Sequence, residues 1–145
     1  MAQGGIVRFI QEAVAMSVGE LRKNQMMAHP MDALSRGEDI RHYGRLVFVM
    51  VARHFLSEDQ VFEQLQLDPN LNEEKARALI EQVVTKGYSP ASREKALEFQ
   101  QQQQFSICPN AKDPDACNIY KDLKFPPEVY ESITEYHEEK AEAQG

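Results

Sequence analysis

The sequence predicts an all-α fold, an irregular helical bundle of five to seven helices around a central buried helix at residues 39–56, with a loop-rich C-terminal segment. Three observations lead to this prediction. Apolar residues recur at helical spacing along most of the chain. Residues that cap helices stand where several of these stretches begin. No stretch alternates apolar and polar residues convincingly, so no β-sheet is expected.

The central helix is predicted at residues 39–56, where five apolar residues follow one another from Val47 to Val51. The stretch is too long for a strand, contains no proline, and has Gly44 as its one glycine. A helix that is apolar around most of its circumference is typically buried. It is not expected to cross a membrane, because it carries three arginines and two histidines, whereas a bilayer requires about 20 apolar residues. Asp39 is expected to cap its first turn.

An earlier helix is predicted at residues 5–27, whose apolar residues fall at helical spacing. His29 precedes Pro30, and a residue before proline avoids the helical region, so the helix is expected to end there. Residues 30–34 are then expected to form one short turn. Three methionines near this end are expected to fill the core: Met26, Met27 and Met31.

Two further helices form a predicted hairpin after the central helix. Ser57 and Gln60 have the spacing of a capping box, which opens a helix over residues 57–66. Asn72 caps the next helix, which extends to about Lys86 and stops at a glycine. The oxygen-bearing residues between the two resemble the start of a calcium loop. The glycine and the glutamate that such a loop requires are missing, so a capped helix start is the favoured interpretation.

Another helix is predicted after Ser89, which would be its cap, with Pro90 in the first helical position. It is expected to run into five consecutive glutamines, residues 100–104, as an exposed helix end. Asp113 and Pro114 repeat the pattern of a cap followed by proline and are expected to begin one short helix.

One domain is expected for the whole chain, residues 1–145. It divides into a helical core at residues 5–104, a cysteine-bearing loop segment with a terminal helix at residues 105–138, and a frayed tail at residues 139–145. The terminal helix is expected to follow the paired prolines at residues 126–127.

The net charge of −7 is unevenly distributed. Residues 1–56 carry seven Lys or Arg and five Asp or Glu, a balance of +2, whereas residues 57–145 carry nine and eighteen, a balance of −9. An acidic half argues against wrapping nucleic acid, whose affinity comes largely from Lys and Arg that neutralise phosphates. With two cysteines and no recognisable secretory signal, a cytoplasmic location without membrane contact is expected.

Cys108 and Cys117 are separated by eight residues, and three interpretations stay open. They pack as thiols, they form a reversible disulfide around a small loop, or they bind zinc with a histidine. The spacing lacks the closely paired cysteines of a structural zinc site, so neither a metal nor a cofactor is predicted. His54, one of the histidines considered for that site, is expected to be a core residue whose ring nitrogens bond to backbone carbonyls or a tyrosine.

No catalytic residue is predicted, because the sequence contains no phosphate loop, nucleophile elbow or paired-histidine zinc motif. The expected function is a non-enzymatic protein–protein interaction or regulatory module, a small subunit or adaptor that binds another protein or a second copy of itself. One alternative is a nucleic-acid-associated accessory protein that uses the arginine face of the central helix. The other is a redox- or metal-responsive protein that uses Cys108 and Cys117. The candidate partner-binding residues are Arg41, Arg45, Arg53, Tyr120, Phe125, Tyr130 and Tyr136.

Overall fold

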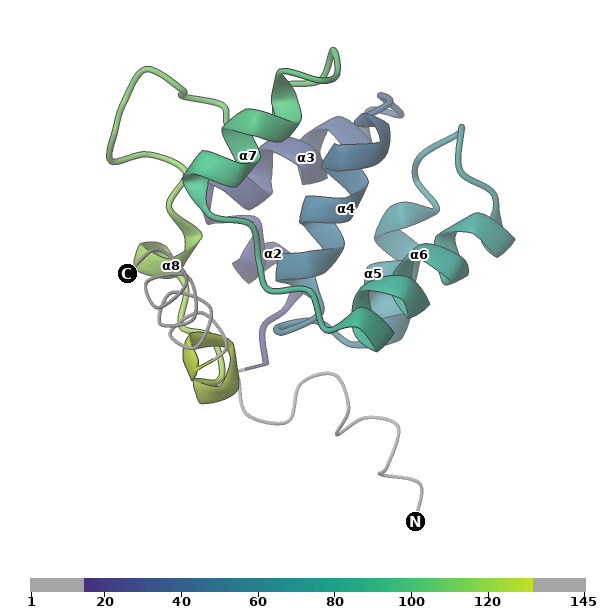
Figure 1. The fold of residues 1–145 in the computed structure, drawn as a ribbon. Helices are drawn as coiled ribbons and strands as arrows, with labels where there is room; N and C mark the ends of the chain where they lie inside the picture. Colours follow the sequence, from purple (N-terminus) through teal and green to yellow (C-terminus); the bar gives the residue numbers. More distant parts are fainter. Residues whose placement is uncertain (1–14, 132–145) are drawn as a thin grey trace.

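Helix α4, Arg41–Ala52, lies at the centre of the molecule (Figure 1). The structure, a computed structural model, describes residues 15–131. The helices packed against α4 include α3 (Gln25–Ser35), α5 (Glu58–Leu65), α6 (Glu73–Lys86) and α7 (Arg93–Gln100). The described residues form helices, turns and loops but no strand, so the predicted all-α bundle around a central helix is confirmed. No helix within this range is long and apolar enough to span a membrane.

The second half of α4 is enclosed on all sides, since every residue from Leu46 to Ala52 is buried. This burial allows neighbouring helices to pack around its whole circumference. Nearer its start, Gly44 permits a close approach of the chain. A Cβ atom at Gly44 would lie 3.0 Å from Cβ of Ile40 and 3.3 Å from the ring of Phe105. The glycine therefore makes room for the Phe105 ring against the helix.

The bounds of α4 are narrower than the predicted range of residues 39–56. Residues 53–56 form turns, and the N-cap position is occupied by Ile40. The prediction that Asp39 caps the helix is therefore wrong. Its carboxylate accepts a hydrogen bond from the backbone N–H of Arg41 at 2.8 Å, so Asp39 forms a turn just before the helix.

The predicted helix at residues 5–27 is wrong where the structure describes it, and residues 5–14 lie outside the described residues. Helix α2 is a single turn, Val18–Leu21, with a capping box of its own. Asn24 then caps α3 by accepting a backbone N–H of its first turn. Each cap satisfies N–H groups that a helix start leaves unpaired, so two short helices replace the continuous one.

Pro30 lies inside α3, so the expected helix end at His29 and the turn at residues 30–34 are also wrong. A proline within a helix removes one backbone hydrogen bond. Burial of Pro30 and its apolar neighbours offsets that loss. The buried neighbours are Met26, Met27, Met31, Ala33 and Leu34. The three methionines therefore fill the core, as predicted.

The hairpin of α5 and α6 has the caps that the sequence predicts. The side chain of Ser57 accepts the N–H of Gln60, and the side chain of Gln60 accepts the N–H of Ser57. Asn72 caps α6 by accepting the N–H of Lys75 at 2.8 Å. The helix ends at Gly87, whose φ of 64° lies in the left-handed region that favours glycine.

Helix α7 begins at Arg93, later than predicted. Its cap is Ser92, which accepts a backbone N–H of the first turn at 3.2 Å. The predicted cap at Ser89 is wrong, because Pro90 is buried in the connection that leads to the helix. The helix ends at the first of the five glutamines. Residues 101–105 form turns and bends, so the prediction of a glutamine helix end is also wrong.

The cysteine-bearing segment contains one short helix, α8, at Ile119–Asp122. The expected start at Asp113 and Pro114 is wrong, because that stretch forms turns in which the Asp113 carboxylate accepts a backbone N–H at 2.9 Å. Residues 127–131 are helical, so the terminal helix begins at the second of the paired prolines, one residue earlier than predicted. The rest of that helix and the tail at residues 139–145 lie outside the described residues.

Candidate functional site

A disulfide joins Cys108 and Cys117, with their Cα atoms 5.7 Å apart. Of the three interpretations left open by the sequence, the structure shows the disulfide. Both cysteines are buried, with 2% and 3% of their surface exposed. Residues 15–131 contain no group of three or more His, Cys, Asp or Glu side chains positioned to hold a metal ion.

The residues between the two cysteines form a loop on the surface. We call residues 108–117 the cystine loop. Residues 109–115 are all exposed, and the loop projects from the helices at the upper left of Figure 1, between α7 and α8. Its two ends are anchored, because Ile107 and Ile119, just outside the disulfide, are buried in the hydrophobic core. The cystine loop is therefore an exposed segment whose two ends are held in the core.

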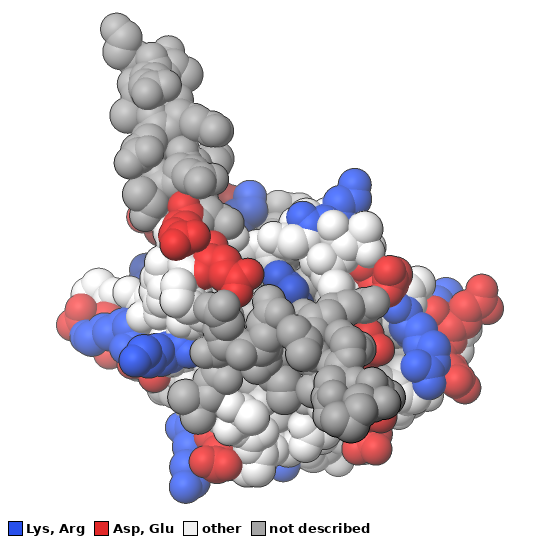
Figure 2. Space-filling view, turned by 90° about the horizontal axis from the view of Figure 1, so that it is seen from below, with Lys and Arg blue, Asp and Glu red and all other residues white. Residues whose placement is uncertain are grey.

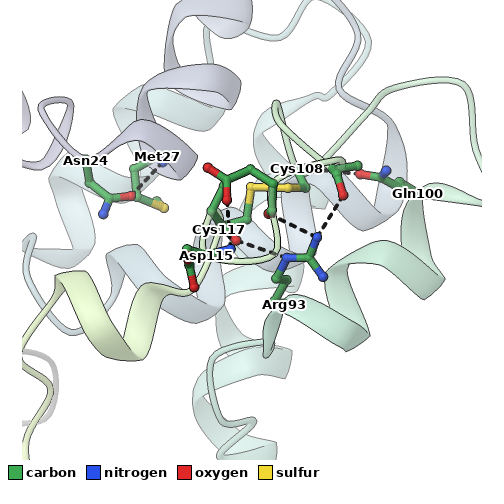
Figure 3. Close-up of a disulfide and its surroundings, with 10 residues drawn as sticks. Asn24, Met27, Arg93, Gln100, Cys108, Asp115 and Cys117 are labelled. Atoms are coloured by element: carbon green, nitrogen blue, oxygen red, sulfur yellow. Dashed lines mark hydrogen bonds between the residues drawn. A yellow bond between two sulfur atoms is a disulfide. The ribbon is translucent and has the colours of Figure 1, made fainter.

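Arg93, the first residue of α7, holds the cystine loop through hydrogen bonds to its backbone (Figure 3). Its Nη2 donates to the carbonyl oxygens of Ala111 at 2.7 Å and Asp113 at 3.2 Å. Its Nε donates to the carbonyl oxygen of Ala116 at 3.1 Å. The planar guanidinium presents several donors in a fixed fork, so one side chain satisfies three carbonyl groups of a turn-rich segment. Nothing in the neighbouring sequence distinguishes Arg93 from an ordinary helical arginine, so its role could not be predicted.

The far end of α7 also holds the loop. The side-chain oxygen of Gln100 accepts the backbone N–H of Cys108 at 2.8 Å. The start and the end of α7 therefore both bind the cystine loop, Arg93 through its carbonyls and Gln100 through one N–H. A single helix orients the loop relative to α4.

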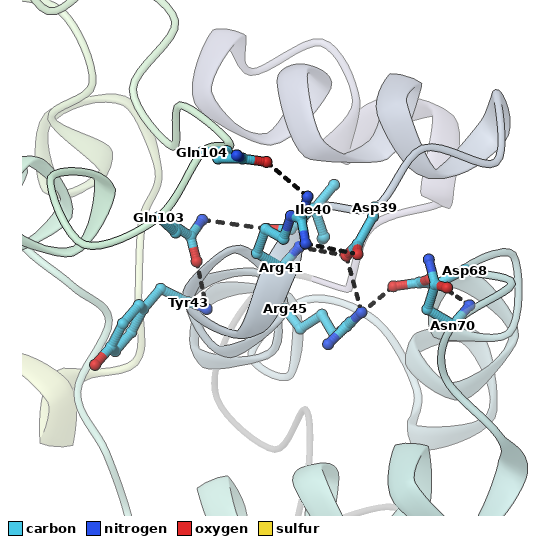
Figure 4. Close-up of polar contacts among 9 residues, drawn as sticks. All are labelled: Asp39, Ile40, Arg41, Tyr43, Arg45, Asp68, Asn70, Gln103 and Gln104. Atoms are coloured by element: carbon cyan, nitrogen blue, oxygen red, sulfur yellow. Dashed lines mark hydrogen bonds and ion pairs between the residues drawn. The ribbon is translucent and has the colours of Figure 1, made fainter.

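Gln103 and Gln104, later in the same run, bind the start of α4 (Figure 4). Gln103 accepts the backbone N–H of Tyr43 at 2.9 Å and donates to the carbonyl oxygen of Ile40 at 3.2 Å. Gln104 accepts a hydrogen bond from Nη2 of Arg41 at 2.7 Å. The glutamine run is thus attached to a helix start about 60 residues earlier in the chain, a role that its uniform composition does not reveal.

The arginines of the predicted binding face have partners inside the molecule. Arg45 bonds to Asp68 at 2.7 Å and to Asp39 at 3.0 Å, with 15% of its side chain exposed (Figure 4). Arg41 lies near Asp39 at 3.5 Å. Arg53 is half-buried and donates to the carbonyl oxygen of Tyr88 at 3.4 Å. Burial lowers the pKa of Arg53, because it disfavours the charged form.

Charges of both signs are interspersed over the face of the molecule shown in Figure 2. A nucleic-acid interface requires clustered Lys and Arg that neutralise phosphates. The described residues visible on that face do not gather into one basic area.

The predicted aromatic surface is only partly exposed. Phe125 is buried, 3% exposed, and packs against Phe55 with ring centroids 5.2 Å apart. The hydroxyl of Tyr120 donates to the carbonyl oxygen of Pro90, and burial raises the pKa of Tyr120 to about 12. Tyr130 is 39% exposed, and its hydroxyl accepts the backbone N–H of Phe125. Tyr136 lies outside the described residues.

His54 lies in the core, as predicted, with 6% of its surface exposed. Its ring meets that of Phe125 edge-on, with centroids 5.5 Å apart. Its Nε2 atom has no hydrogen-bond partner within the described residues, contrary to expectation. Burial lowers the pKa of His54 to about 3, with a smaller contribution from the nearby charge of Arg53, so the ring is neutral at pH 7.

Comparison of the chain with protein-family models, with curated proteins and with solved structures finds no match.

Proposed function

We propose that the protein is a non-enzymatic interaction module that presents the cystine loop to a partner protein. The observation that carries this proposal is the combination of exposure and rigidity in one segment. Residues 109–115 are exposed, yet the disulfide, Arg93 and Gln100 hold the segment on a helix packed against α4.

Such a loop is well suited to recognition. Binding requires the ordering of flexible groups, and a segment that is already ordered loses less conformational entropy when a partner binds. Loops carried on a rigid framework are frequent binding sites for the same reason. The loop offers charges of both signs at Lys112, Asp113 and Asp115, which favours a polar contact with another protein.

The arginines of α4 support this choice over a nucleic-acid function. Arg45 and Arg41 have acidic partners within the chain, and these partners would have to be displaced before either residue contacted phosphate. The alternative would show itself as binding that weakens steeply with salt.

The experiment is affinity purification from the native host with paired charge-swap variants. Lys112→Asp with Asp115→Lys alters the loop and keeps the net charge. The matched control is Glu74→Lys with Lys75→Glu on α6, where both residues are exposed. We expect a stoichiometric partner to be retained by the wild type and the control and lost by the loop variant. Equal retention by all three would exclude the loop as the contact, and the absence of any stoichiometric partner would contradict the function itself.

The cytoplasmic location expected from the sequence stays a prediction. The cytoplasm keeps most thiols reduced, whereas an oxidising compartment maintains disulfides. Rapid alkylation of thiols in intact cells distinguishes the two settings. Free Cys108 and Cys117 would support the cytoplasm, and a pair protected from alkylation would indicate an oxidising compartment.

A further inference from the structure

The cystine loop is closed by two fastenings of different chemistry. One is the covalent bond between Cys108 and Cys117. The other is polar and belongs to α7, with three hydrogen bonds from Arg93 and one to Gln100. The polar fastening reaches the backbone next to both cysteines, because Gln100 binds the N–H of Cys108 and Arg93 binds the carbonyl group that precedes Cys117.

The position of the sulfur atoms controls how the bond can be reduced. A disulfide is reduced when a thiolate attacks one of its sulfurs, so an attacking thiol must reach that atom. Cys108 and Cys117 are 2% and 3% exposed, which blocks direct approach. The loop must therefore move away from α7 before exchange takes place.

We propose that the disulfide acts as a redox latch. It can be reduced only after the cystine loop opens, and Arg93 is the positioning residue that keeps the loop closed. A dithiol reductant is the co-reactant. Its thiolate bonds to one sulfur and releases the other cysteine as a thiolate, which takes up a proton. The second thiol of the reductant then displaces the bound cysteine. The reductant ends as a disulfide, and two electrons have passed to Cys108 and Cys117.

Reduction should free the loop and leave the bundle folded. Cys117 has a φ of 64°, a left-handed conformation that is unfavourable for a residue with a side chain, so the loop gains by relaxing once the bond is broken. Ile107 and Ile119 hold the flanking chain in the core independently of the disulfide. Opening and reduction of the loop take place within the isolated protein and do not require that the loop contacts a partner.

The test measures the rate at which dithiothreitol reduces the native protein, followed by alkylation and the increase in mass. We expect Arg93→Gln to be reduced about tenfold faster than the wild type or more, the change expected when a charge-assisted hydrogen bond is lost. Arg93→Lys, which keeps the charge but lacks the fork, should fall between them. The matched control is Arg36→Gln, since Arg36 is an exposed arginine that bonds to Glu38.

Hydrogen exchange of the oxidised and reduced wild type completes the test. Reduction should increase exchange of the backbone N–H groups of residues 108–117 and leave those of α4 protected. An Arg93→Gln rate equal to that of the wild type would overturn the gating role. Unchanged exchange in the loop after reduction, or loss of protection in α4, would overturn the latch. None of these outcomes depends on the purification experiment, so the two proposals fail separately.

Discussion

Arg45 and Asp68 form a shielded ion pair in which Nε lies 2.7 Å from Oδ2 and the Asp68 side chain has no exposed surface. The pair joins the central helix to the turn between α5 and α6. The second oxygen of Asp68 accepts the backbone N–H of Asn70 at 2.8 Å, so the carboxylate also orders the turn. A buried charge that has lost its partner is costly, which makes this pair sensitive to substitution.

Asp68→Asn should lower the free energy of unfolding by about 2–3 kcal/mol, somewhat less than the loss of a fully buried partner, because Arg45 keeps Asp39. Urea denaturation followed by circular dichroism measures the change. Glu38→Gln is the control, because it breaks an exposed pair with Arg36 and should leave the midpoint close to that of the wild type. An Asp68→Asn variant as stable as the wild type would show that the Arg45–Asp68 pair does not stabilise the turn.

Gly44→Ala should destabilise the protein, although alanine is by itself the better helix former by about 1 kcal/mol. The added methyl group would lie 3.0 Å from Cβ of Ile40, which is part of the packed chain and moves only with it. Gly19→Ala in α2 is the control, since the nearest neighbouring atom would be 3.9 Å away. We expect thermal denaturation to show a lower midpoint for Gly44→Ala and an unchanged or higher one for Gly19→Ala. The reverse order would contradict the close packing of Phe105.

His54 should make stability depend on pH. Its pKa is lowered from 6.5 to about 3 in the folded protein, so the unfolded chain binds a proton in that interval and the folded protein does not. Stability is therefore full above pH 6.5 and falls as the pH drops towards 3. At pH 5 the loss is on the order of 2 kcal/mol, at about 1.4 kcal/mol for each pH unit.

His54→Leu should remove this part of the pH dependence. Urea denaturation at pH 7.5 and pH 5 gives the comparison, and exposed His42→Gln is the control expected to keep the wild-type difference. An equal loss of stability in His54→Leu and wild type would show that another group is responsible.

Replacement of both cysteines, Cys108→Ser with Cys117→Ser, should lower the free energy of unfolding by about 2–3 kcal/mol, the chain-entropy effect of closing a small loop. The helical signal in far-ultraviolet circular dichroism should persist, because the flanking chain is anchored by Ile107 and Ile119. Loss of that signal would mean that the bundle depends on the disulfide.

The parts of the fold that the sequence predicts correctly are those determined by residues close to one another in the sequence. Helix α6 is the clearest case, since Asn72 caps its start and Gly87 ends it, and each acts within one turn. Pro30 shows the limit of local reasoning. Its effect on α3 is decided by burial against other helices, a tertiary term that outweighs the local preference.

The candidate site was less accessible to such reasoning. The spacing of Cys108 and Cys117 permitted a disulfide but did not select it. Arg93 acts on carbonyl groups 18 to 23 residues away, and the partners of Gln103 include atoms 60 residues away. Backbone groups look alike in every sequence, so contacts to them leave no pattern that could be recognised beforehand.

The glutamine run carries one more consequence. Gln100 binds the cystine loop, Gln103 and Gln104 bind the start of α4, and the positions between them set the distance. Insertion or deletion of one glutamine would barely alter composition, charge or hydropathy. It would nonetheless displace one set of contacts by a full residue, so that the loop and the central helix could not both be held. The length of this tract is therefore specified to a single residue, because this repetitive stretch sets the distance between the cystine loop and the start of α4.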